Sequence, residues 1–120
     1  MHASVFRCFS KNDTKKERPL AVKISRDDDI EKKIVFEKEF KITHGLIHPN
    51  IVRSLELFTN EFSGETHQVM EYVDGIEVFE KIANQAGSYS EDDARAFFKQ
   101  LLEAIGYMHS QGVAHRDIKP

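Results

Sequence analysis

The sequence shifts near Gly75 from mainly strand-like to helical spacing of its apolar residues, and this shift sets the fold class. Before Gly75, apolar residues form short runs bounded by polar residues, as in β-strands. After Gly75 the spacing is helical, and from Ala94 onward apolar residues recur at i, i+3, i+4, i+7, i+8, i+11 and i+14. A strand-rich first part and a helical second part predict an α+β fold divided into residues 1–74 and 75–120.

Four strands and one helix are predicted in the first part. Turn-forming or polar residues separate four apolar runs, which favours a small antiparallel sheet. These runs cover residues 4–10, 20–24, 51–58 and 67–73. Between the second and third runs, the aspartates at 27–29 offer helix N-caps, and Asp28 with Glu31 has the spacing of a capping box. We expect this helix to reach about Leu46, with Gly45 or the following His-Pro pair as its stop.

Two helices are predicted in the second part. The first runs from Ile76 to about Gln85. A second capping box, Ser90 with Asp93, opens a longer helix that should end near Ser110, with Gly112 as its stop.

Composition excludes several classes of function. The net charge of -3 and the pI near 6.1 leave no basic surface for nucleic acid. No stretch approaches the ~18 apolar residues of a membrane span, and no secretory leader is recognisable. Cys8 is the only cysteine, which favours a reducing compartment and predicts a cytoplasmic or nuclear protein.

Lys23 lies within an apolar run, where a charged side chain needs either solvent or a partner. Snorkelling to the surface is the usual outcome for such a lysine. On the predicted helix, however, Glu39 falls on the stripe expected to face the sheet. That stripe consists of Val35, Glu39, Ile42, Thr43 and Leu46. Glu39 either edges this stripe or pairs with Lys23, and we favour an ion pair between sheet and helix.

These residues, together with two further motifs, resemble a protein kinase domain. The segment Ala21–Lys23 reads A-V-K, and H-P-N-I-V begins at His48, nine residues after Glu39. The last six residues read H-R-D-I-K-P, which resembles the start of a catalytic loop of the serine/threonine class. The resemblance implies a truncated kinase fold, with a small lobe of about four antiparallel strands and one helix, followed by two helices of the large lobe. Within the family, E-Y-V-D-G and the helix after Ser90 look most like the calcium/calmodulin-dependent and AMP-activated group.

The resemblance also implies a role for each candidate residue. Lys23 would hold the α- and β-phosphates of ATP, and Glu39 would orient Lys23. Asp117 would accept the proton of the substrate hydroxyl, and Lys119 would neutralise charge on the transferred phosphoryl group. The other candidates surround the nucleotide: Val5 and Ala21 cover the adenine, Met70 is the gatekeeper, Glu71 and Val73 bond the adenine through their backbones, and Glu77 lies near the ribose. For the apolar candidates, simple core packing is the competing interpretation.

Several parts of the family pattern fall outside this sequence or differ in it. Ala3 takes the third position of the glycine-rich loop, and the asparagine and D-F-G that hold magnesium would follow Pro120. Thr43 and Ser54 stand where the family usually has apolar residues. The isolated chain is therefore expected neither to catalyse phosphoryl transfer nor to bind nucleotide tightly. It is also expected to expose an apolar stripe made of Phe97, Phe98, Leu101 and Ile105.

The predicted function is that of a serine/threonine protein kinase fragment whose parent protein uses ATP and magnesium and acts on a protein substrate. The alternative is a pseudokinase-like module that binds other proteins without catalysis. Intact Lys23, Glu39 and Asp117 favour the enzyme.

Overall fold

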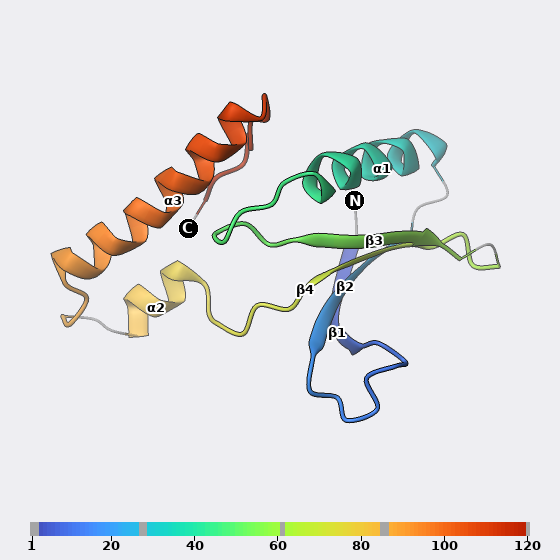
Figure 1. The fold of residues 1–120 in the computed structure, drawn as a ribbon, viewed down its shortest axis with the longest axis horizontal. Coiled ribbons are helices and arrows are strands. Elements are labelled where there is room, and N and C mark those ends of the chain that lie inside the picture. The colour runs from blue at the N-terminus through green and yellow to red at the C-terminus, as the bar shows by residue number, and fades with distance from the viewer. Residues whose placement is uncertain (1–2, 27–28, 61, 85–86, 120) are drawn as a thin grey trace. The chain divides into compact units, whose positions relative to one another are not determined.

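The computed structural model describes residues 3–26, 29–60, 62–84 and 87–119 (Figure 1). The chain separates into two compact units. The first comprises Met1–Ile47 and Val52–Tyr72, and the second comprises His48–Ile51 and Val73–Pro120.

The first unit contains a four-stranded antiparallel sheet, as predicted, with strand order β1-β2-β4-β3 (Figure 1). The strands are β1 (Ala3–Phe9), β2 (Pro19–Ser25), β3 (Ser54–Thr59) and β4 (Thr66–Glu71). The third strand starts three residues later than the apolar run suggests. The cause is the turn before it, in which the Ile51 N–H donates to the His48 carbonyl at 3.1 Å.

Helix α1 (Ile30–His44) packs on β3 and covers one face of the sheet (Figure 1). Its N-cap is Asp29, whose side chain accepts the Glu31 N–H at 2.9 Å, and its C-cap is Gly45, as predicted. The predicted capping box drew on Asp28, which lies outside the described residues. The sequence therefore placed both ends of this helix to within a few residues.

The buried stripe of α1 differs from the predicted one. Phe36 is 1% exposed, whereas Val35 and Ile42 are 56% and 49% exposed. The prediction was wrong at these two positions because burying Phe36 removes more apolar surface from water than burying Val35. The resulting rotation places Glu39 at the edge of the stripe, where its carboxylate keeps contact with solvent.

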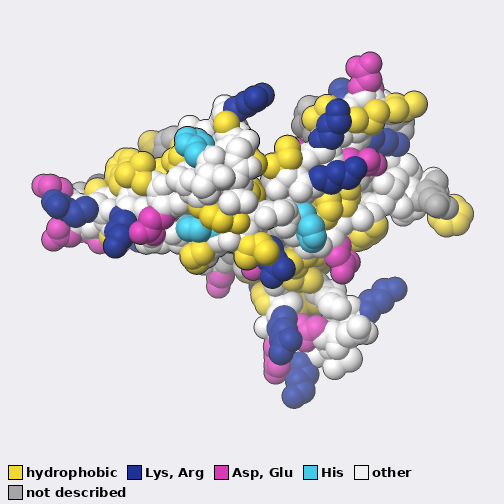
Figure 2. Space-filling model, turned by 45° about the horizontal axis from the view of Figure 1, so that its top comes forward, with side chains coloured by type: hydrophobic (Ala, Val, Ile, Leu, Met, Phe, Trp, Pro, Cys, Tyr) yellow, Lys and Arg dark blue, Asp and Glu magenta, His cyan; other side chains and the backbone are white. Residues whose placement is uncertain are grey.

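The interior of the first unit is small and unusually polar. Among the described residues of this unit, the buried apolar side chains are Ala21, Phe36 and Leu46. The buried polar side chains are Ser25, Ser54, Thr66 and Gln68. Figure 2 shows hydrophobic side chains, in yellow, lying open among charged ones on the surface. Buried polar groups need hydrogen-bond partners, so the internal hydrogen bonds of this unit carry much of its specificity.

The second unit contains α2 (Val78–Asn84) and α3 (Glu91–Ser110). The predicted capping box opens α3: the Ser90 Oγ accepts the Asp93 N–H at 3.1 Å, and the Asp93 carboxylate accepts the Ser90 N–H at 3.0 Å. The Ser90 hydroxyl also donates to the Asp93 carboxylate at 2.7 Å, and this hydrogen bond, followed by the one from the Ser90 N–H, lowers the pKa of Asp93. Just after α3, Gly112 has φ +72°, a conformation that favours glycine at a helix end.

The apolar face of α3 is only partly open. Phe98 is 56% exposed and Leu102 is 63% exposed. The predicted exposed stripe is thus present at Phe98, but Phe97, Leu101 and Ile105 are half-buried, which corrects the prediction for these three. Among the described residues, no helix has the length and apolar character needed to cross a membrane.

Candidate functional site

The predicted ion pair between sheet and helix is present. The Lys23 Nζ on β2 lies 3.5 Å from the Glu39 Oε1 on α1. The side chains are 25% and 49% exposed, so water screens the pair and it contributes at most about 1 kcal/mol. Lys23 gains a second contact because its Nζ lies 5.1 Å from the centre of the Phe36 ring, which attracts a cation through its face.

The strand register brings four predicted nucleotide-binding residues to the same face of the sheet. Val5 is the β1 neighbour of Lys23, and Ala21 lies two residues before Lys23 on β2. Met70 on β4 is directly opposite Ala21. Directly paired residues and residues two apart share a face of a sheet. Glu39 reaches the same face from α1, so the first unit brings these five residues together.

Glu71 is already held by another strand segment. Its N–H donates to the Arg53 carbonyl at 3.0 Å, and its carboxylate accepts the Arg53 N–H at 3.0 Å. The N–H of Glu71 is therefore committed within the protein.

The second unit carries the other predicted site residues. Val73 is 64% exposed, and Glu77 is an exposed residue directly before α2. The Lys119 Nζ and the Asp117 Oδ2 form an ion pair at 3.1 Å, and both side chains are 74% exposed. A carboxylate that is open to solvent and next to an ammonium group can accept a proton from a hydroxyl and leave the ammonium to balance charge.

The backbone of the H-R-D segment has an uncommon conformation. Arg116 has φ +67°, a left-handed backbone conformation that is unfavourable for residues other than glycine. The Asp117 N–H donates to the His115 Nδ1 at 3.2 Å, which makes this ring nitrogen an acceptor. A strained turn that is held in place by a neighbouring side chain is typical of functional segments.

The sequence did not indicate one residue on the Lys23 face, Gln68. It is the β4 neighbour of Lys23 and is 5% exposed. Its Nε2 donates to the Ser54 Oγ at 2.8 Å, and Ser54 in turn contacts Thr43, the other polar replacement noted in the sequence. The available signal was the alternation of β4, which places Gln68 on the same face as Met70.

Other polar groups of the first unit lie apart from Lys23. Glu65, next to β4, pairs with Arg26 and lies 3.5 Å from the His67 Nε2. A hydrogen bond with Ser63, aided by Arg26, lowers the pKa of Glu65. Burial raises the pKa of the Cys8 thiol and makes it a poorer nucleophile.

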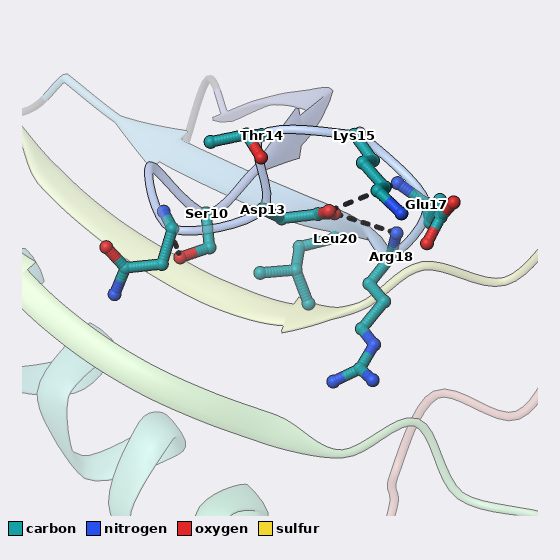
Figure 3. A pocket seen from close by; sticks show the side chains of 8 residues that line it. Ser10, Asp13, Thr14, Lys15, Glu17, Arg18 and Leu20 are labelled. Atoms are coloured by element: carbon teal, nitrogen blue, oxygen red, sulfur yellow. Dashed lines mark hydrogen bonds between the residues drawn. The ribbon is translucent and has the colours of Figure 1, made fainter.

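A hollow in the β1–β2 connection is lined mainly by polar side chains (Figure 3). The Asp13 carboxylate crosses this loop and accepts the N–H groups of Glu17 and Arg18 at 3.3 and 2.8 Å. Asp13 therefore serves the loop itself, and the hollow contains none of the predicted site residues. Across the described residues, no group of three or more His, Cys, Asp or Glu side chains is arranged to hold a metal ion.

Comparison with known proteins gives one consistent result. The family model for the protein kinase domain matches residues 1–120. Calcium/calmodulin-dependent protein kinase type IV of Mus musculus is 42% identical over 116 residues, which are 97% of this chain and 23% of that protein. CBL-interacting protein kinase 9 of Oryza sativa subsp. japonica is 40% identical over 111 residues, which are 90% of this chain and 24% of that protein. The chain thus spans about a quarter of the length of these relatives.

Proposed function

The chain belongs to the protein kinase family, and on that premise we propose that it is part of a serine/threonine kinase that transfers the γ-phosphate of ATP to protein hydroxyl groups. Residues 1–74 would belong to the small lobe, and residues 75–120 would begin the large lobe. The observation that carries the proposal is the Lys23–Glu39 ion pair on the sheet face shared with Val5, Ala21 and Met70.

The sheet face supports a role in nucleotide binding. Ala21 has a small side chain and shares its face of the sheet with Val5 and Met70, an apolar set suited to the flat adenine ring. The ammonium group of Lys23 is a compact positive charge suited to phosphate oxygens, and Glu39 holds it in place at 3.5 Å. Magnesium, when bound, would supply positive charge that offsets the negative charge of the phosphates held by Lys23.

The second unit supports a role in the transfer step. Asp117 would orient the substrate hydroxyl and accept its proton, because its carboxylate is exposed and accepts hydrogen bonds. Lys119, 3.1 Å from it, would offset charge on the transferred group. A lysine at this position supports Ser/Thr specificity, as do the kinase relatives. The single cysteine supports a cytoplasmic or nuclear location.

The test uses the full-length protein that carries this sequence, with magnesium and labelled ATP, on peptide mixtures that offer serine, threonine or tyrosine. We expect label on serine or threonine. Lys23→Met should lower kcat/KM at least 100-fold, and Asp117→Asn should lower kcat by about 100-fold to 10,000-fold. Lys15→Met is the matched control, because Lys15 is an exposed lysine in the β1–β2 connection. Equal loss in Lys23→Met and Lys15→Met would contradict the assigned roles.

The alternative proposal is a pseudokinase-like module that binds partner proteins without catalysis. The polar pair Thr43 and Ser54, where relatives of this family usually have apolar side chains, favours it. In the same assay, nucleotide binding without transfer to any hydroxyl would support this alternative and exclude the enzyme.

A further inference from the structure

A continuous chain of hydrogen bonds connects the sheet to α1. The Gln68 Nε2 lies 2.8 Å from the Ser54 Oγ, which lies 2.9 Å from the Thr43 Oγ1. The Thr43 Oγ1 lies 3.0 Å from the carbonyl oxygen of Glu39 and 3.1 Å from that of Phe40. This series of hydrogen bonds therefore ends at the backbone of Glu39, the residue that pairs with Lys23.

The last link fixes the direction of every bond in this chain. A carbonyl oxygen only accepts, so the Thr43 hydroxyl must donate to it. Thr43 then accepts from the Ser54 hydroxyl, whose own proton is thereby used. Ser54 must accept from Gln68, which requires that the amide NH₂ group of Gln68 faces it. Each of the two hydroxyls thus donates its one proton and accepts one hydrogen bond within the network.

Burial of Ser54 and Gln68 makes this hydrogen-bond network sensitive to the loss of a partner of either residue. Ser54 is 3% exposed and Gln68 is 5% exposed, so water cannot replace a missing partner without entering the interior. The Oε1 of Gln68 is buried without a partner among the described residues, and Gln68 is the cross-strand neighbour of Lys23. One end of this series of hydrogen bonds, Gln68, thus lies beside Lys23, and the other end lies at the backbone of Glu39.

Among the described residues, few other side-chain contacts fix α1 on the sheet. Phe36 is the buried apolar residue of α1, Leu46 is buried two residues after the helix, and the Lys23–Glu39 pair is too exposed to hold a helix by itself. The last turn of α1 adds a second bond at the same place, where the His44 Nδ1 donates to the Ser54 carbonyl at 2.9 Å. Ser54 therefore makes a hydrogen bond with each of two neighbouring side chains of the last turn of α1, those of Thr43 and His44.

We propose that Gln68, Ser54 and Thr43 are positioning residues that set α1 on the sheet so that Glu39 faces Lys23. Their effect on nucleotide binding rests on the proposed function, but their effect on the ion pair does not. Loss of the Thr43 hydroxyl leaves the Ser54 proton without an acceptor and frees the turn of α1 that carries Glu39. Lys23 then loses its partner without any change in Lys23 or Glu39 themselves.

The test measures the reactivity of the Lys23 amine toward acetic anhydride in the full-length protein, followed by mass spectrometry of the labelled peptide. Thr43→Val removes the hydroxyl and keeps the shape of the side chain. Ser54→Ala removes the hydroxyl in the middle of the series of hydrogen bonds. Thr43→Ser keeps a hydroxyl at position 43 and serves as the conservative variant. Thr59→Val is the matched control, because Thr59 is an exposed threonine on β3. Thermal unfolding is recorded for each variant to confirm cooperative folding.

We expect acetic anhydride to label Lys23 roughly fivefold faster in Thr43→Val and in Ser54→Ala than in the wild type. A factor of about five corresponds to the free energy of about one net hydrogen bond. Thr43→Ser and Thr59→Val should label at the wild-type rate. In a Glu39→Gln background, where Lys23 has already lost its partner, Thr43→Val should add nothing, because the two changes act through the same contact.

Three results would overturn the inference: unchanged labelling in folded Ser54→Ala, the same fivefold increase in the Glu39→Gln background, or no effect of Glu39→Gln itself. If Thr43→Val does not fold, Ser54→Ala and Thr43→Ser still decide the question. ATP binding, measured by calorimetry on the same proteins, separates this inference from the proposed function. Wild-type protein that does not bind ATP contradicts the function alone, whereas ATP binding with labelling independent of Thr43 contradicts the inference alone.

Discussion

Phe36→Ala should loosen α1 more than any other single truncation of an apolar side chain in the first unit. Phe36 is 1% exposed and is the only large side chain among the described residues that is fully buried. Truncation of a buried phenylalanine to alanine costs about 3–5 kcal/mol. We take about 3 kcal/mol, because the solvent-exposed side of α1 allows the cavity to collapse in part. The lost contact between the Phe36 ring and the Lys23 ammonium adds about 0.5 kcal/mol.

The total of about 3.5 kcal/mol corresponds to a roughly 400-fold increase in the opening equilibrium of the helix. Hydrogen exchange on the full-length protein, read on peptides that cover Ile30–His44, measures this opening directly. Phe62→Ala is the matched control, because the same truncation at a side chain that is fully exposed should change exchange less than threefold.

Similar changes in α1 exchange from the two truncations would contradict this prediction. An increase of less than tenfold in Phe36→Ala would contradict it too, because α1 would then depend on contacts other than its buried ring.

Two further predictions concern α3. Gly112→Ala should destabilise the end of this helix by about 1 kcal/mol, because φ +72° strains any residue with a Cβ although the space around it is open, and a lowered thermal unfolding midpoint would show this. Hydrogen bonds from Ser90 lower the pKa of Asp93, so the carboxylate stabilises the native state fully above the ordinary aspartate pKa of about 3.9 and loses this effect as the pH falls through the lowered value. Far-ultraviolet circular dichroism between pH 2 and 6 should therefore show an acid-dependent loss in the wild type that is smaller in Asp93→Asn, and identical profiles would contradict the role of the cap.

The sequence was sufficient for the elements of the fold because their ends carry local signals. Ser90 with Asp93 formed the expected capping box, and Gly45 ended α1. Residues around Pro49 instead form a turn, and β3 begins only at Ser54. The predicted start at residue 51 was too early, because an apolar run alone does not distinguish a strand from the extended segment before it. The rotation of α1 was also missed, because both Val35 and Phe36 are apolar and only packing chooses between them.

In the candidate site, too, some contacts could be predicted from the sequence and others depended on packing. Lys23 and Glu39 could be paired from sequence, because each was a charge in an apolar setting and a counter-charge resolves both. Gln68 could not be linked to Thr43, because a hydrogen bond between side chains far apart in sequence has no periodicity of its own. The polar character of Thr43 and Ser54 was visible, but their contact at 2.9 Å required the packing of α1 on β3.

The small, polar interior of the first unit also bears on its response to temperature. Exposure of apolar surface raises the heat capacity on unfolding, and exposure of polar surface lowers it. Among the described residues, Ser25, Ser54, Thr66 and Gln68 share this interior with Ala21, Phe36 and Leu46. Such an interior should therefore unfold with a smaller heat-capacity increment per residue than an ordinary apolar core. The stability of this unit should then vary gently across the physiological range, with a broad maximum in place of a sharply curved one.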